Sequence, residues 1–169
     1  MSSEGYFVFD IKDDAEDQQL KNKNARRVIP IHPMLISAGF LNYVDVVKAT
    51  PRKNIFHTIK KVSGHSYSHS YSKELLPVRR RLGLTKTESN KDFHSLRHTF
   101  LTKLKHLMIP ETIAMQIVGH SAGESISYTR YGKDHPIEQL YEAMSKVEYD
   151  FKPETLELIR TRLKRLILT

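Results

Sequence analysis

The sequence predicts a mixed α+β fold that is mainly helical, with a small antiparallel β-hairpin or sheet near the N-terminus. Two short runs of aromatic and β-branched residues lie before position 33. After it, apolar residues recur every three or four positions over several stretches, as in amphipathic helices. The 169 residues are enough for one domain with a substantial hydrophobic core, so we expect a single domain over 1–169.

The two N-terminal runs are expected to pair as a hairpin. Residues 6–11 read YFVFDI, and residues 25–32 read ARRVIPIH. Pro30 in the second run indicates a sheet edge or the end of a strand, because proline has no N–H to donate. The polar and acidic residues 12–20 form the connection.

The helical body is predicted to begin at Pro33, which suits the first turn of a helix that fades near Ala49. Residues 55–72 show little apolar periodicity and end in GHSYSHSYS, which predicts a loop. Further helices are expected over residues 73–82, 93–108, 110–118, 136–147 and 153–168. Gly119 is placed to end the third of these. The last is strongly amphipathic, so its apolar stripe must pack on its own domain or on a neighbouring protomer.

Composition favours a nucleic-acid partner. Lys and Arg outnumber Asp and Glu by 27 to 19, and the net charge is +8. Basic clusters at 26–27, 52–54, 60–61 and 79–81 suit a surface that touches phosphates at several points. The chain has no cysteine, which excludes disulfides and thiolate chemistry and suits a reducing compartment such as the cytoplasm. No apolar run is long enough to span a membrane.

One stretch, FHSLRHTF followed by IVGHSAGESISYTRYGK, gathers residues that handle phosphate. His94 and Arg97 lie three positions apart and should share a helix face, away from the stripe that seats the helix. That stripe is expected to contain Leu96, Phe100, Leu101, Leu104 and Met108. His120 follows Gly119 at a helix end, and Tyr131 comes eleven residues later. Arginine and histidine donate hydrogen bonds to anionic oxygens, and tyrosine supplies a hydroxyl nucleophile.

Less specific interpretations of these residues exist. A helical HxxR pair by itself is more often a solvated or core-bridging pair than a binding site. The histidine pairs at 65/69 and 94/98 have four-residue spacing, which raises the possibility of a metal site. The first pair has no third convergent ligand, and the second lacks the glutamate of a zinc-protease motif. Neither pair therefore predicts a metal.

Taken together, these motifs resemble the catalytic domain of the tyrosine recombinase, or phage integrase, family. HxxR, then GH, then the tyrosine of YGK follow in the family's order. Upstream, LKNKNARRVIPIHP resembles the family's lysine-bearing β-hairpin, and SYSHSYSKELLPVRRRLGL resembles the stretch that precedes the HxxR helix. The resemblance covers roughly residues 5–133.

The resemblance implies a role for each matching residue. Tyr131 would attack a scissile DNA phosphate and form a 3′-phosphotyrosyl link. Arg97 would bind the non-bridging oxygens, and His94 and His120 would complete the cage. Lys21 would be the general acid for the leaving 5′-oxygen. Such enzymes need no metal and no cofactor, because the phosphotyrosyl bond conserves the energy of the cleaved bond.

Two assignments keep close competitors. Lys23 competes with Lys21, because the register of a hairpin shifts easily. Tyr128 competes with Tyr131, because the spacing after the GH pair is longer than in many relatives. We favour Tyr131, since YGK after an arginine matches the ending of the phage type.

The resemblance also implies a biological setting: site-specific DNA recombination and the integration of phage or prophage DNA. The partners would be double-stranded DNA and other integrase protomers, with the helix over 153–168 docking in trans. One departure is expected to matter. The family has a further arginine upstream of the hairpin, and the arginines of ARR and RRR lie in the wrong places to replace it. We therefore expect little cleavage by this polypeptide alone; the alternative function is a non-catalytic DNA-binding remnant.

Overall fold

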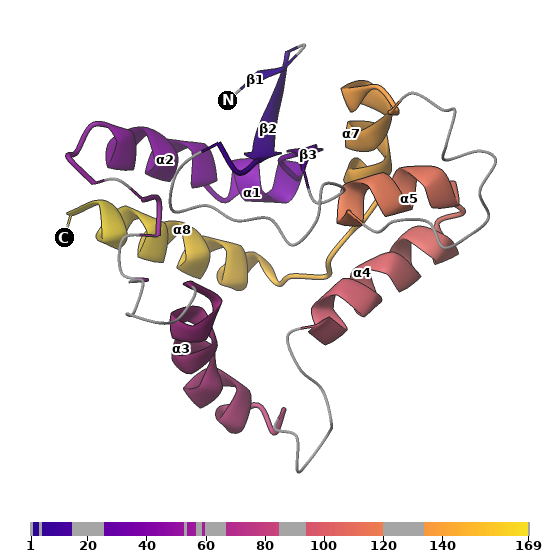
Figure 1. The fold of residues 1–169 in the computed structure, drawn as a ribbon. Coiled ribbons are helices and arrows are strands. Elements are labelled where there is room, and N and C mark those ends of the chain that lie inside the picture. The colour runs from indigo at the N-terminus through magenta and orange to yellow at the C-terminus, as the bar shows by residue number, and fades with distance from the viewer. Residues whose placement is uncertain are drawn as a thin grey trace.

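The structure is a computed structural model, and it describes residues 2–3, 5–14, 26–52, 54–56, 59, 67–84, 94–119 and 134–168. Three strands form one antiparallel sheet in the order β1 (Ser2–Ser3), β2 (Tyr6–Ile11), β3 (Arg27–Pro30). The helices are α1 (Pro33–Ser37), α2 (Phe40–Lys48), α3 (Tyr67–Arg81), α4 (His94–His106), α5 (Glu111–Val118), α7 (Ile137–Ser145) and α8 (Pro153–Leu168) (Figure 1). This architecture confirms the predicted mainly helical α+β class.

The sheet contains the predicted hairpin. β2 and β3 pair antiparallel, with Val8 opposite Pro30 and Ile11 opposite Arg27. Pro30 is the last residue of β3, in agreement with its expected position at a strand end. β1 is an addition that the sequence did not predict, because two serines carry no strand pattern.

The main core lies between the sheet and the pair α5 and α7. Its buried members are Val8, Ile113, Ile117, Ile137, Leu140, Ala143 and Met144. A second cluster around Leu104 on α4 adds Ala114 and Val147. The side chains of α5 therefore contribute to both clusters, so α5 is the central element against which the sheet, α4 and α7 are positioned.

Two of the predicted element boundaries are wrong. The expected single helix from Pro33 to Ala49 is two helices, because Gly39 has a φ of 89° and interrupts it. α3 begins at Tyr67, so the last six residues of the predicted GHSYSHSYS loop are helical. The helix continues through Pro77 as predicted, and Figure 1 shows it standing apart from the other elements.

His32 connects the start of α1 to the end of α7. Its Nδ1 accepts the backbone N–H of Met34 at 3.1 Å, which caps α1. Because that nitrogen is an acceptor, Nε2 carries the proton and donates to the carbonyl of Val147 at 2.8 Å. One neutral imidazole thus joins two segments that are far apart in the sequence.

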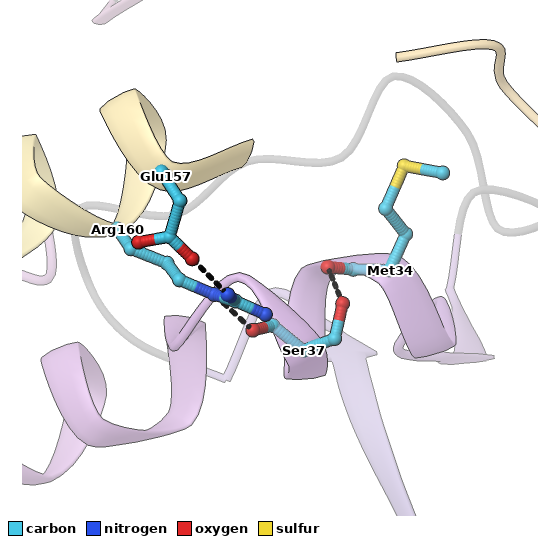
Figure 2. A network of polar contacts seen from close by, with 4 residues as sticks. All are labelled: Met34, Ser37, Glu157 and Arg160. Atoms are coloured by element: carbon cyan, nitrogen blue, oxygen red, sulfur yellow. Dashed lines mark hydrogen bonds and ion pairs between the residues drawn. The ribbon is translucent and has the colours of Figure 1, made fainter. Parts of the chain in front are cut away.

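α8 lies along α1 and α2 of its own chain (Figure 1). Figure 2 shows the polar part of this contact: Arg160 donates to the carbonyl of Ser37 at 2.9 Å and also pairs with Glu157. Ser37 in turn donates to the carbonyl of Met34 at 2.9 Å. Among the described residues, no helix has the length and apolar character needed to cross a membrane.

Candidate functional site

Arg97 projects from α4 onto the C-terminal end of α5. Its Nη2 donates to the carbonyl of Val118, the last residue of that helix. Its Nε is buried and has no hydrogen-bond partner among the described residues. The last carbonyls of a helix lack partners within the helix, so a side-chain donor satisfies one of them here. Arg97 is thus fixed to the end of α5 through one nitrogen.

The face of α4 that seats the helix differs from the predicted one. Leu96, assigned to the seating stripe, is 63% exposed, and Met108 is 87% exposed. The face that packs contains Arg97, half-buried, together with Phe100, Leu101 and Leu104. The prediction that Arg97 lies away from the seat is therefore wrong. It lies on the seat because the helix end opposite offers carbonyl oxygens rather than an apolar surface.

Arg27, the first residue of β3, reaches the same helix end from the sheet. Its Nε donates to the carbonyl of Ile117 at 3.1 Å, next to the carbonyl that Arg97 contacts. Two guanidinium groups, 70 positions apart in the sequence, therefore bind adjacent carbonyls of α5. The partial negative charge at a helix C-terminus favours cations at this place.

The two cations affect each other. Burial lowers the pKa of Arg27 below its ordinary value, and the positive charge of Arg97 lowers it further. A guanidinium stays protonated in proteins despite such a shift, so both groups carry a full charge at neutral pH. The two guanidinium groups therefore place two positive charges at the end of the helix that carries partial negative charge.

Gly119 gives Arg27 the space it occupies. The residue caps α5 in the left-handed conformation, with a φ of 68°, and its N–H bonds to the carbonyl of Met115 at 2.8 Å. A Cβ at this position would lie 2.6 Å from Cζ and from Nη1 of Arg27. Glycine is therefore required here for the backbone conformation and for the approach of the guanidinium.

His94 is the first residue of α4 and is exposed. Its ring lies edge-on to the ring of His98, with centroids 5.2 Å apart and an interplanar angle of 76°. The structure thus places His94 one helical turn before Arg97, beside another histidine. The described contacts bring Arg97 together with Arg27 rather than with His94.

The chain returns to α5 at His135. The backbone N–H of His135 donates to the side-chain oxygen of Gln116 at 2.8 Å, and the Gln116 amide donates to the carbonyl of His135 at 3.3 Å. The His135 ring also hydrogen-bonds to the hydroxyl of Thr112, 2.9 Å away. Because Gly119 caps the same helix, α5 holds the residues on both sides of the segment 120–133.

Three predicted site residues, His120, Tyr131 and Lys21, lie outside the described residues. The competitors Lys23 and Tyr128 do too. The structure therefore places Arg97 and His94 of the predicted set.

Sequence reasoning missed Arg27 as part of the site. The expectation that the arginines of ARR cannot replace the family's upstream arginine stays a prediction; the structure places the Arg27 guanidinium near that of Arg97. Strand alternation was the available signal: Arg27 and Ile29 point to one face of β3 and are half-buried, whereas Val28 on the other face is 38% exposed. Ile29 packs against the main core, so Arg27 had to point inward as well.

Within the described part of the chain, no group of three His, Asp or Glu side chains could hold a metal ion.

The chain matches no model of a known protein family, no curated protein and no solved structure.

Proposed function

We propose that this chain is a catalytic domain of the tyrosine recombinase type, which cleaves and rejoins double-stranded DNA in the cytoplasm of a bacterial cell. The observation that carries the proposal is the contact between Arg97 of the HxxR motif and the carbonyl of Val118. That contact sets the arginine against the helix end from which the sequence runs directly into Gly119 and His120. Arg97 of the HxxR motif thus contacts the helix that ends at Gly119, the first residue of the GH pair.

The proposed reaction is a transesterification. The Tyr131 hydroxyl gives its proton to solvent water, and its oxygen forms a bond to the phosphorus while the bond to the 5′-oxygen breaks. Lys21 gives the leaving oxygen a proton. Arg97, with His94 and His120, stabilises the extra negative charge on the non-bridging oxygens, as preorganised donors do in other transition states. Rejoining is the reverse of these steps.

The basic character of the chain supports a DNA partner. The last turn of α3 carries Arg79, Arg80 and Arg81, and the last turn of α4 carries Lys103, Lys105 and His106. Positive charges at several places on a surface attract the phosphate backbone without regard to sequence. This charge supports association with DNA, and the Arg97 contact supports chemistry on it.

The test is a search for covalent adducts. The full chain is incubated with a pool of random duplexes that carry 5′-bridging phosphorothiolates, whose sulfur leaves without a proton and traps even slow cleavage. We expect adducts that survive denaturing electrophoresis, are lost in Tyr131→Phe and persist in Tyr128→Phe. Adducts that persist in Tyr131→Phe would refute the assigned nucleophile. DNA binding with no adduct under any condition would identify a non-catalytic DNA-binding protein instead.

We also propose that protomers meet on DNA through α8. Among the described side chains of α8, residues 153–165, none is buried, and Leu158 is 52% exposed. The exposed part of its surface, which includes Leu158, is therefore available to a second protomer. Light scattering of the protein with DNA should show oligomers that a Leu158→Glu variant weakens. A monomer on DNA in both proteins would contradict the idea.

A further inference from the structure

We infer that Gln116 of α5 is a positioning residue, which holds the backbone at His135 and thereby the chain that leads back to Tyr131. Gln116 and His135, together with Thr112 and Gln139, form what we call the His135 clasp. The role toward Tyr131 rests on the proposed function, in which that tyrosine is the nucleophile. The clasp itself rests on the contacts of the described residues.

Gln116 binds both backbone groups of His135. Its side-chain oxygen accepts the His135 N–H at 2.8 Å, and its amide nitrogen donates to the His135 carbonyl at 3.3 Å. A primary amide contains an acceptor and two donors, so one glutamine can pair with both groups as a neighbouring strand does. Two bonds to one residue fix its orientation as well as its position. Gln116 is half-buried and precedes Ile117 of the main core, so packing holds the anchor in place.

The His135 ring adds two bonds, one to each of two helices. Nδ1 lies 2.9 Å from the amide oxygen of Gln139 on α7, and Nε2 lies 2.9 Å from the hydroxyl of Thr112 on α5. An amide oxygen only accepts, so Nδ1 carries the proton and Nε2 accepts from the hydroxyl. His135 therefore has a protein partner for both backbone groups and both ring nitrogens, although it is only half-buried. Water can satisfy polar groups at such a place, so burial alone does not explain four bonds from the protein.

The docking of α7 does not depend on the clasp. Ile137 and Leu140 of α7 are buried in the main core, in the same cluster as Ile113 and Ile117 of α5. Apolar burial of this extent holds a helix without the help of hydrogen bonds near the surface. The clasp therefore fixes the chain just before α7 rather than α7 itself.

The clasp connects both proposed catalytic residues of this region to one turn of α5. Gly119, which ends α5, lies three positions after Gln116. His120 follows Gly119 directly, and Tyr131 lies four positions before His135. An extended chain spans at most about 3.6 Å per residue, so the Cα of Tyr131 lies within about 14 Å of the Cα of His135. A displacement of about 1 Å at a reacting group can slow a reaction about 100-fold, so a fixed tether at this range affects the rate.

The test measures covalent adduct formation at saturating DNA, separately from DNA affinity. The full chain and its variants are mixed with the 5′-bridging phosphorothiolate duplexes, and the rate is followed over a single turnover. Gln116→Leu keeps the size of the side chain and removes both bonds, so it should slow adduct formation about tenfold or more. DNA affinity should stay within about twofold, because no charge is lost. Gln116→Glu keeps the acceptor for the His135 N–H and loses the donor, so it should give an intermediate rate.

The alternative is that the clasp serves only stability. A purely structural role lowers the fraction of folded protein, and hence the final amount of adduct, but leaves the rate of the folded molecules unchanged. Tyr43→Phe on α2 is the matched control, because it removes the bond of 2.6 Å from the Tyr43 hydroxyl to the carbonyl of Ile55. It should leave the rate within about twofold of the parent rate.

Hydrogen exchange at the His135 amide tests the clasp without DNA. Loss of the Gln116 acceptor in Gln116→Leu should make this amide exchange at least about fivefold faster, whereas Tyr43→Phe should change it less than about twofold. Unchanged exchange in Gln116→Leu would overturn the clasp. Adducts that form at the parent rate in Gln116→Leu would overturn the positioning role and leave the recombinase standing. A parent chain that forms no adduct would reject the recombinase, and the positioning role with it.

Discussion

Replacing Gly119 with alanine tests the arrangement of the arginines through stability. Two costs are expected. A residue with a Cβ at a φ of 68° loses about 1–2 kcal/mol relative to glycine. The new Cβ would also lie 2.6 Å from the Arg27 guanidinium, so that flexible side chain must move off the Ile117 carbonyl. A hydrogen bond to a charged group contributes about 1.5–3 kcal/mol.

Moving Arg27 also takes its positive charge away from that of Arg97. The weaker repulsion between the two charges offsets part of the loss of the hydrogen bond. We therefore expect Gly119→Ala to lower the free energy of unfolding by about 2–4 kcal/mol. Gly39→Ala is the matched control, because Gly39 has a φ of 89° and an added Cβ there meets nothing within 4 Å. It should cost only the backbone part, about 1–2 kcal/mol.

The decisive measurement is a double-mutant cycle by urea unfolding, followed by circular dichroism. In an Arg27→Ala background the side-chain part disappears, so Gly119→Ala should cost about as much as Gly39→Ala. The difference between the two backgrounds should be at least about 1 kcal/mol. Equal costs of Gly119→Ala in both backgrounds would refute the packing of Arg27 against this glycine.

Three further outcomes are expected. Leu104→Ala should cost about 2–5 kcal/mol, because its side chain is fully buried, whereas Leu107→Ala, at 41% exposure, should cost under about 1 kcal/mol; similar values in urea unfolding would contradict the core assignment. Burial raises the pKa of Tyr149 above its ordinary 10.0, because the buried hydroxyl disfavours the charged form. The protonated Tyr149 therefore contributes its full stabilisation of the folded state below pH 10, and this contribution is lost as the pH rises through the raised pKa. Tyr149→Phe should therefore unfold less readily than the parent chain as the pH is raised above about 10, and an unchanged alkaline profile would argue against burial of the hydroxyl. DNA affinity should be weak, independent of sequence and steeply dependent on salt, and a flat response to salt in fluorescence anisotropy would count against phosphate contacts.

Local signals predicted much of the fold. Pro33 opens α1, Gly119 ends α5, and the stripe over residues 153–168 gives α8 with its bounds unchanged. Each of these depends on residues that are close in the sequence, such as a proline at a first turn or a glycine in the left-handed conformation. Such features can be recognised in the sequence without knowledge of any tertiary contact.

The errors arise where contacts between residues far apart in the sequence determine which side chains face the core. Leu96 was assigned to the seat of α4 by periodicity, but the partner surface is a helix end whose carbonyls favour Arg97. Arg27 was not expected beside Arg97, from which 70 positions separate it, and strand pairing and the core bring the two side chains together. A local sequence pattern does not indicate which charged side chains will contact the same helix end, as Arg27 and Arg97 both contact α5.

The core also determines when this chain can fold during synthesis. Val8 on β2 packs in the same cluster as Leu140 on α7, although 132 positions separate them. Contacts of such long range form slowly, because the intervening chain must be ordered first. The core around Val8 therefore cannot form on the ribosome until α7 has left the exit tunnel, and until then the Val8 side chain stays exposed. A nascent chain stalled before residue 137 should bind chaperones, and release of the finished chain from the ribosome should let the sheet close against α7.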